Sequence, residues 1–260
     1  MLTLKIITIN TWKGEDAYDV RIENLKQQLL VLQPDIILMQ ECFEAPMLEK
    51  DTIGYINQAF NYHLDFIQAR EKIRDFEEFP VQSFSNMAIL SRLPILNSFH
   101  YPLPLADGDE MRFGQEIEFF LENGKTAILT NIHLTHVNQN SNIRLEQIKK
   151  ITERVQHQKN ILHIIGGDFN ATINSPEIQY FIQQANLIES FSYIQPKEKH
   201  HTLVDYQHKN KDLGVDFIFV SNEQKQYKIT QAMACLNEPI PTSYGYCSDH
   251  FGMLLNIEYA

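Results

Sequence analysis

Short apolar runs that meet a polar residue at one end recur along the whole chain. A buried strand has this appearance, and ligand sites form where such strands end at the edge of a sheet. Five of these junctions are present: Leu2–Ile9 before Asn10, Asp35–Met39 before Gln40-Glu41, Thr126–Ile132 before His133, Ile161–Ile165 before Gly167-Asp168-Phe169-Asn170, and Ser248-Asp249-His250 before Phe251–Ile257. The pattern predicts a sheet protein whose chemistry lies at the strand ends.

Helical patterns separate the strand-like runs. Tyr18–Leu32 and Asn142–Val155 each place apolar residues close to one helix face, and Ser175-Pro176-Glu177 opens a third helix with a good cap. Phe113–Leu121 and Thr126–Leu134 flank a hairpin turn. We therefore predict an α/β fold of about ten strands and three or four helices, in which two mixed sheets pack together with the helices outside.

The region between residues 44 and 85 is less regular. We predict a helix over Glu44–Phe60, a strand over Tyr62–Ile67, and a surface loop over the charged and aromatic segment Glu71–Pro80. No Gly/Ser-rich linker and no repeat of short period interrupts the chain. Residues 1–260 are therefore expected to form a single domain.

Cysteine usage and hydropathy bear on the compartment. Cys42, Cys235 and Cys247 have no metal-site spacing, and free thiols in a reducing compartment are the simplest interpretation. No apolar stretch reaches the roughly 18 residues of a membrane span, and Met1–Ile9 lacks the basic start of a signal peptide. We expect a cytoplasmic monomer without a transmembrane segment, and export by a route that needs no signal stays open.

The net charge of −11 bears on the partner. It disfavours a protein that binds a nucleic-acid backbone through a broad basic surface. A nuclease that works through a metal ion and a local basic groove is still compatible with this charge. Clustered carboxylates in an acidic chain also suit a divalent cation.

Carboxylates after two of the apolar runs are candidates for metal and water chemistry. Glu41 would offer hard oxygen ligands to Mg²⁺ or Mn²⁺, although an ordinary loop glutamate has the same appearance. Asp168 and Asn170 follow two glycines that allow a tight bend, and together they could orient a water and hold a phosphoryl oxygen. The alternative is a strand-to-helix turn in which both side chains only make Asx turns.

Two histidines stand at comparable positions. His133 ends an apolar strand, where a single histidine is more often a core residue than a ligand. Asp216 begins an apolar strand, and a buried acid there needs a partner. His250 is the candidate partner, because the pair would orient and charge the imidazole. The alternative is that Asp216 caps a turn with Leu213-Gly214.

The remaining candidates each have a structural alternative. The Asn10 amide could bind a metal or hydrogen-bond a metal ligand, and Trp12 could form a substrate wall or pack at a loop base. Arg112 could clamp a phosphate or form a salt bridge with Asp109 or Glu110. Three histidines of the segment 192–213 are expected to form a surface cluster rather than a second metal site: His200, His201 and His208.

In chain order these residues resemble the pattern of the endonuclease/exonuclease/phosphatase superfamily, also called DNase I-like. The resemblance spans residues 2–258, and its specificity lies in the order of the pieces, each of which is weak alone. The set is Asn10, Gln40-Glu41, Asn86-Met87-Ala88-Ile89-Leu90-Ser91-Arg92, His133, Gly167-Asp168-Phe169-Asn170, Val215-Asp216-Phe217 and Ser248-Asp249-His250. It implies a four-layer α/β/β/α sandwich with the site at one end of the paired sheets, and phosphoester hydrolysis with Mg²⁺ or Mn²⁺.

The resemblance also implies roles at the metal and the attacking water. Glu41 would be the main metal ligand, helped by Asn10. Asp249 would be a further metal ligand or an orienting residue. Asp168 would position or deprotonate the attacking water, as in-line attack on phosphorus requires.

Other matched residues would act on the phosphate and the leaving group. Asn170 and His133 would hold the scissile phosphate. His250, paired with Asp216, would stabilise the charged transition state or protonate the leaving oxygen. Arg112 loosely matches the place where some members carry a phosphate-contacting arginine.

The resemblance does not extend to one subfamily. The inositol-polyphosphate 5-phosphatase patterns and the apurinic-endonuclease pattern Gln-Glu-Thr-Lys are missing, since Gln40-Glu41 is followed by Cys42-Phe43. His133 makes the chain look more like DNase I, sphingomyelinase-like and general bacterial members. The phosphodiester could belong to a small molecule, a lipid head group or a nucleic acid, so a DNA- or RNA-cleaving nuclease is one alternative. A catalytically silent binding scaffold of the same fold is another, although no matched position is lost.

Overall fold

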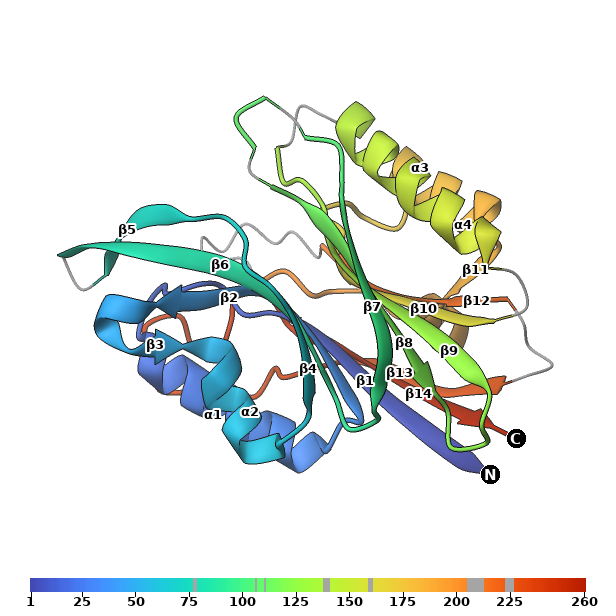
Figure 1. Cartoon of the computed structure of the whole chain (residues 1–260), viewed down its shortest axis with the longest axis horizontal. Coiled ribbons are helices and arrows are strands. Elements are labelled where there is room, and N and C mark those ends of the chain that lie inside the picture. The colour runs from blue at the N-terminus through green and yellow to red at the C-terminus, as the bar shows by residue number, and fades with distance from the viewer. Residues whose placement is uncertain are drawn as a thin grey trace.

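The computed structural model of the chain describes residues 1–76, 79–105, 107–109, 111–137, 141–158, 161–204, 213–222 and 227–260. These residues form two mixed β-sheets that pack face to face, with helices on the outer face of each sheet (Figure 1). The predicted α/β sandwich of two packed sheets with helices outside is confirmed.

The first sheet has the strand order β13-β14-β1-β2-β6-β4, with β3 beside β2 and β5 beside β6. β1 is parallel to β2 and antiparallel to β14, so the sheet is mixed. Its strands are β1 (Leu2–Asn10), β2 (Ile36–Ala45), β3 (Lys50–Asp51), β4 (His63–Ile67), β5 (Lys72–Phe76), β6 (Phe79–Ser91), β13 (Tyr227–Cys235) and β14 (Gly252–Tyr259).

The second sheet has the strand order β11-β12-β10-β9-β8-β7. β9 and β10 are parallel, and the other neighbouring strands are antiparallel. Its strands are β7 (Ile95–Pro102), β8 (Phe113–Phe120), β9 (Thr126–His133), β10 (Leu162–Asp168), β11 (Leu187–Glu189) and β12 (Asp216–Ser221).

The helices lie outside the two sheets. Figure 1 shows α1 and α2 against the first sheet and α3 and α4 against the second. Among the described helices, none combines the length and the apolar character that crossing a bilayer requires. The helices are α1 (Tyr18–Leu32), α2 (Thr52–Phe60), α3 (Ser141–His157), α4 (Pro176–Gln184) and α5 (Ser190–Ile194), and a single 3₁₀ turn, η1, covers Pro46–Leu48.

Three buried apolar clusters separate the layers. In β1, Ile6 belongs to the cluster between the sheets, whereas Ile7 belongs to the cluster that contains the buried face of α1. In β10, Ile164 belongs to the cluster between the sheets and Ile165 to the cluster with α3 and α4. Because both faces of these strands are buried, their sequences are apolar without alternation, which explains the runs seen in the sequence.

The region between residues 44 and 85 differs from the prediction. The helix covers only Thr52–Phe60, because β2 continues to Ala45 and pairs with β6 as far as Glu44. The predicted surface loop Glu71–Pro80 is wrong, since β5 and the start of β6 pair there, with Glu77 and Glu78 outside the described residues. Within the described residues there are fourteen strands and five α-helices rather than about ten and three or four.

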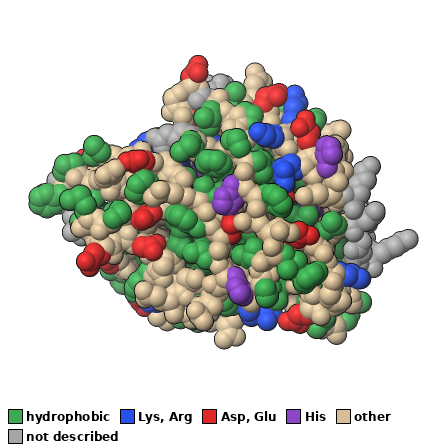
Figure 2. Space-filling model, in the orientation of Figure 1, with side chains coloured by type: hydrophobic (Ala, Val, Ile, Leu, Met, Phe, Trp, Pro, Cys, Tyr) green, Lys and Arg blue, Asp and Glu red, His purple; other side chains and the backbone are tan. Residues whose placement is uncertain are grey.

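The β5–β6 hairpin projects from the body of the molecule as an arm (Figure 1). Ile73 is 77% exposed and Phe79 is 71% exposed, and Figure 2 shows hydrophobic side chains gathered on this projecting part. One side of the arm is covered, since Val81 is buried and Phe76 stacks on Phe43, but the apolar residues of the arm do not alternate regularly with polar ones. At the base of the arm, the Ser85 N–H donates to the Ala69 carbonyl at 3.1 Å, which fixes Arg70 at the edge of the first sheet.

The close approach of β9 and β10 at Gly167 gives a stability prediction. Gly167 has φ +146°, and a Cβ there would lie 2.0 Å from the Ile132 carbonyl oxygen. Gly124, in the hairpin turn, has φ +81° with nothing within 4 Å of a Cβ. Gly167→Ala should lower the free energy of unfolding by roughly 3 kcal/mol or more, and the control Gly124→Ala by about 1 kcal/mol. Urea unfolding measures both, and equal losses would contradict the close contact at Gly167.

Candidate active site

Three predicted site residues lie in one row across the second sheet. Asp168 of β10 is directly opposite His133 of β9 on one side and Asp216 of β12 on the other. Residues two apart on a strand share a face, and Ile164 and Gly166, four and two residues before Asp168, face the first sheet. The row therefore points into the layer between the sheets, at the end where that layer changes from apolar to polar.

Asn10, at the end of β1, meets this row from the first sheet. Its Nδ2 donates to Asp168 Oδ2 at 3.0 Å, and its Oδ1 accepts the Trp12 N–H at 3.0 Å. One step deeper, Gln40 Nε2 donates to Asn131 Oδ1 at 2.7 Å. Asn131 Nδ2 also donates to the carbonyls of Met39 and Ala88, so several buried hydrogen bonds join the two sheets at this end of the sandwich.

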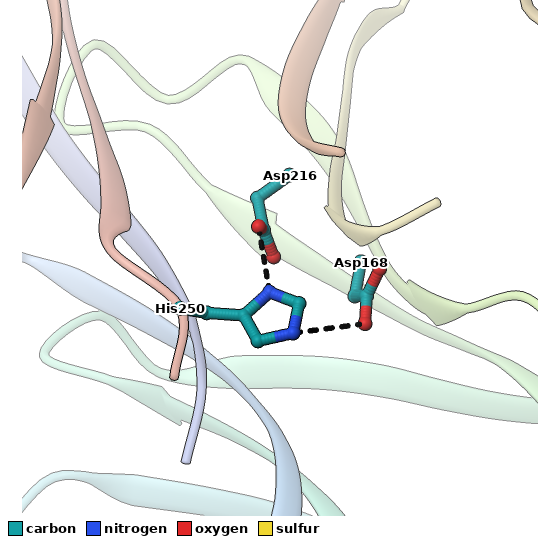
Figure 3. Close-up of side chains that lie close together, drawn as sticks. All are labelled: Asp168, Asp216 and His250. Atoms are coloured by element: carbon teal, nitrogen blue, oxygen red, sulfur yellow. Dashed lines mark hydrogen bonds and ion pairs between the residues drawn. The ribbon is translucent and has the colours of Figure 1, made fainter. Parts of the chain in front are cut away.

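The close-up in Figure 3 shows His250 between two carboxylates. His250 Nδ1 is 2.8 Å from Asp216 Oδ2, and Nε2 is 3.9 Å from Asp168 Oδ2. The structure therefore places His250 within hydrogen-bond reach of Asp216, as the sequence predicts. All three side chains are buried, so their charges interact with little screening by solvent.

A threonine that the sequence did not single out positions this pair. Thr202 Oγ1 accepts the N–H of Val215 at 3.0 Å and of Asp216 at 3.2 Å. Its carbonyl accepts the N–H of Phe251 at 2.7 Å. One buried threonine thus fixes the chain on both sides of the Asp216–His250 pair, and no strand or helix pattern marks its segment.

The electrostatic field of the site favours a charged His250 and a protonatable Asp168. Burial acts to lower the pKa of His250, but Asp216, Asp168 and Asp249 outweigh it and hold that pKa well above 6.5. Burial raises the pKa of Asp168 to about 7, against the opposing charge of His250 and with a further rise from Asp216. At neutral pH the histidine is a proton donor and the aspartate can accept a proton.

Glu41 lies in a bulge rather than at a strand end. The register of β2 against β6 shifts between Met39 and Cys42, and Glu41 has φ +54°, a left-handed conformation that costs energy for a non-glycine residue. The prediction that β2 ends before Glu41 is therefore wrong. The bulge turns the Glu41 side chain out of the ladder and toward the site.

Two basic side chains that the sequence did not single out form ion pairs with Glu41. Arg70 Nη2 donates to Glu41 Oε1 at 2.8 Å, and Lys13 Nζ lies 3.3 Å from the same oxygen. Burial acts to raise the pKa of Glu41, but Arg70 and Lys13 outweigh it and lower that pKa to about 2. The carboxylate is therefore ionised and available to a further cation.

His133 stays neutral, beside two buried arginines. Its Nε2 is 3.4 Å from Asp168 Oδ2. Burial lowers its pKa well below 6.5, and Arg112 and Arg70 lower it further. A neutral imidazole at this place can donate one hydrogen bond and accept another.

Arg112 forms the salt bridge that the sequence offers as its alternative role. It lies 3.0 Å from Asp109, with a side chain only 1% exposed, and its Nη2 contacts His136 Nδ1 at 3.0 Å. Glu110 is outside the described residues. Within the described part of the chain, the buried Arg112 Nη1 has no hydrogen-bond partner. A phosphate contact by this arginine stays a prediction.

Asn170 and Asp249 border the row. The Asn170 N–H donates to Asp168 Oδ1 at 2.9 Å, which is the Asx turn that the sequence allows, and Asn170 Nδ2 donates to the Leu134 carbonyl at 3.0 Å. Asp249 Oδ1 is 3.9 Å from His250 Nε2. Burial raises the pKa of Asp249 to about 6 against the charge of His250, and Glu41 adds to the rise. Glu41 and Asp249 therefore act on each other as like charges.

The expected surface cluster of histidines differs in the structure. The ring of His200 stacks on Phe191 with centroids 4.9 Å apart and also contacts Phe217. His201 packs edge-on against Phe251, and His208 lies outside the described residues. His200 and His201 therefore pack against aromatic rings.

The model of the Endonuclease/Exonuclease/phosphatase family matches residues 7–250. The chain belongs to this family. No curated protein sequence matches the chain.

Solved structures of the family share the fold. The human Nocturnin catalytic domain with a bound sulfate anion has a TM-score of 0.78 and 17% identity, over 99% of this chain and 95% of that chain. A mannosyl-6-phosphatase of Bacteroides thetaiotaomicron has a TM-score of 0.75 and 17% identity, over 98% and 100%. TDP2 of D. rerio with a single-strand DNA product has a TM-score of 0.73 and 18% identity, over 98% and 99%. At this identity the likeness establishes the fold.

The Asp216–His250 pair gives a titration prediction. Asp216→Asn should lower the pKa of His250, because it removes the nearest opposite charge. Asp249→Asn, the control, removes a more distant charge and should lower it less. Titration of the imidazole by NMR measures both. If Asp249→Asn has the larger effect, Asp216 is not the main partner.

The same pair has a defined effect on stability. Because the folded pKa of His250 lies above 6.5, the pair contributes its full stability below pH 6.5 and loses it as the pH rises through the folded pKa. The stability lost in Asp216→Asn should therefore be greatest at acidic pH.

Proposed function

We propose that this chain is a divalent-metal-dependent phosphoesterase that hydrolyses a phosphodiester by in-line attack of an activated water, with Mg²⁺ or Mn²⁺ as cofactor. One observation carries the proposal, which is the convergence of three side-chain nitrogens on Asp168 Oδ2. Asn10 Nδ2 donates to this oxygen at 3.0 Å, and His133 Nε2 and His250 Nε2 lie 3.4 Å and 3.9 Å from it. Polar groups gathered around one carboxylate oxygen suit a site where water and phosphoryl oxygens bind.

The residues present fit a hard divalent cation. Asn10, Glu41 and Asp249 offer oxygen ligands, which Mg²⁺ and Mn²⁺ prefer. The Arg70 hydrogen bond and the closest approach of Lys13 are both made to Glu41 Oε1. The negative charge of Glu41, which raises the pKa of Asp249, also favours a cation near both carboxylates. When bound there, the cation would neutralise negative charge on the phosphoryl oxygens.

Asp168, Asp216 and His250 form a second set of possible ligands for the cation. Each of them offers one ligand atom, and these three atoms lie within 4.8 Å of one another, as a metal site would require. His250 Nδ1 is, however, engaged by Asp216, and its ring is protonated at neutral pH. A metal-bound histidine must be neutral. We therefore propose that His250 transfers a proton and that Asn10, Glu41 and Asp249 hold the metal.

Side chains then accept or donate each proton that is transferred during the hydrolysis. Asp168 takes a proton from the water as the water oxygen bonds to phosphorus. The bond between phosphorus and the leaving oxygen breaks, and His250 gives its proton to that oxygen. Asp216 holds the His250 ring in place and stabilises its charge. His133 and Asn170 orient the phosphate.

Metal removal and single substitutions test these roles. Wild-type protein should hydrolyse bis-p-nitrophenyl phosphate with Mg²⁺ or Mn²⁺, and EDTA should abolish the turnover. Asp168→Ala and His250→Ala should each lower kcat by about 10²-fold or more, the range for loss of a general base or acid. Asp19→Asn and His157→Gln are the controls, because both residues are exposed on outer helices.

If EDTA, Asp168→Ala and His250→Ala all leave the rate at the wild-type level, the proposed roles are wrong. Absence of metal binding by calorimetry, together with no turnover across a substrate panel, would instead support a silent scaffold. Plasmid DNA, RNA, sphingomyelin, phosphoinositides and nucleotides form that panel, because relatives of this fold include a sugar phosphatase and a protein with a DNA product.

The raised pKa values of Asp168 and His250 predict a bell-shaped dependence of rate on pH. The rate should fall as the pH drops through about 7, where Asp168 gains a proton, and a bound cation should move this limb to lower pH. It should also fall as the pH rises through the pKa of His250. Asp216→Asn should shift the alkaline limb to lower pH more than the acid limb. If the alkaline limb does not move in Asp216→Asn, His250 is not the general acid.

A further inference from the structure

A pocket of about 330 Å³ opens beside the proposed metal site. It shares Asp249 with that site, so a group bound in the pocket would adjoin the phosphate. The lining residues come from the loop after β1, from Val204, which follows the bridge between Leu203 and His250, and from the loop before β14. They are Trp12, Asp16, Val204, Ser243, Tyr244 and Asp249.

Two aromatic rings form one wall of the pocket. The centroids of Trp12 and Tyr244 are 4.5 Å apart, with the rings inclined by 45°. The Tyr244 hydroxyl donates to the Val204 carbonyl at 2.7 Å, which fixes that ring. Neither ring is fully buried, so both present part of their surface to a ligand.

Arg21 holds the Trp12 side of this wall in place without a bound ligand. It is fully buried and donates to the carbonyls of Thr11 at 3.2 Å and of Cys247 at 2.8 Å, which ties the loop after β1 to the loop before β14. Its Cζ lies 4.8 Å from the centroid of the Trp12 ring. Trp12 keeps a left-handed φ of 58°. The pocket is therefore preorganised, which lowers the entropy lost on binding.

The polar groups of the lining select for an uncharged ligand rich in hydroxyl groups. Asp16 and Asp249 supply carboxylate acceptors, and Ser243 supplies a hydroxyl that donates to Asp16 Oδ1. Among the lining residues that the structure describes, there is no Lys, Arg or His. A second phosphate would be repelled by these carboxylates. A cation would be attracted to them, but the Arg21 guanidinium on the Trp12 ring opposes a positive ligand there. Acceptors beside aromatic faces suit the hydroxyls and C–H faces of a sugar.

We propose that this pocket binds the sugar portion of the substrate, so that the enzyme acts on a phosphate ester of a sugar. The inference rests on the proposed phosphoesterase function. Hydrolysis would break the bond between phosphorus and the sugar oxygen, add the water oxygen to phosphorus, and release the sugar with the proton from His250 on its hydroxyl.

The chain carries its own probe for this pocket, because Trp12 is its single tryptophan. Titration with methyl α-D-glucopyranoside should change the tryptophan emission saturably, with a Kd of about 1–10 mM. Tyr244→Ala should raise this Kd by about tenfold, and Tyr244→Phe, which keeps the ring, by less than about threefold. Tyr193→Ala is the control, because Tyr193 is exposed on α5.

Adenosine and choline are the competing probes. A saturable response to either of them with none to the glycoside would overturn the proposal, as would an unchanged glycoside Kd in Tyr244→Ala. Turnover of bis-p-nitrophenyl phosphate by the same wild-type sample tests the proposed function separately. Turnover without a glycoside response rejects only the sugar pocket. A glycoside response without turnover overturns the phosphoesterase proposal and supports the sugar pocket.

Discussion

The whole site depends on one buried layer of polar contacts between the two sheets. Gln40 from the first sheet donates to Asn131 of the second, and Asn131 donates in turn to Gln115 at 2.9 Å. Unpaired polar groups at this depth would cost several kcal/mol, so the network fixes how the sheets pack. A slip of one residue would turn His133 and Asp216 to the opposite face of their sheet.

Several residues near this layer have strained backbone conformations. Glu41, Trp12, Lys13 and Asn170 all have left-handed backbone conformations, at φ values between 48° and 58°. Each such conformation costs roughly 1–3 kcal/mol and persists only where surrounding contacts enforce it. The three apolar clusters and the Arg21 hydrogen bonds supply those contacts. The apolar end of the sandwich thus stabilises a polar end that would not hold its shape alone.

Much of the fold and part of the site could be predicted because both have a one-dimensional signature. β1, β2, β9 and β10 are buried on both faces, so their sequences are continuous apolar runs, and in β1, β9 and β10 the polar residue after the run lies at the strand end. The β5–β6 arm is only partly buried, and its apolar residues follow no regular alternation, so the sequence did not reveal it. Lys13, Arg70 and Thr202 also escaped prediction, because each reaches the site through a contact with a distant segment that no local spacing encodes. The bulge at Glu41 is likewise visible only in the pairing of β2 with β6.

The place of β14 in the first sheet has a consequence for synthesis of the protein. β14 lies between β13 and β1, so these two strands have no neighbour on this side of the sheet until β14 has been synthesised. Until then β1 and β13 each present an open edge that can pair with other chains. Such long-range closure is slow, and partly made chains are open to aggregation. Because His250 lies two residues before β14, its pairing with Asp216 also forms only after this part of the chain has been synthesised.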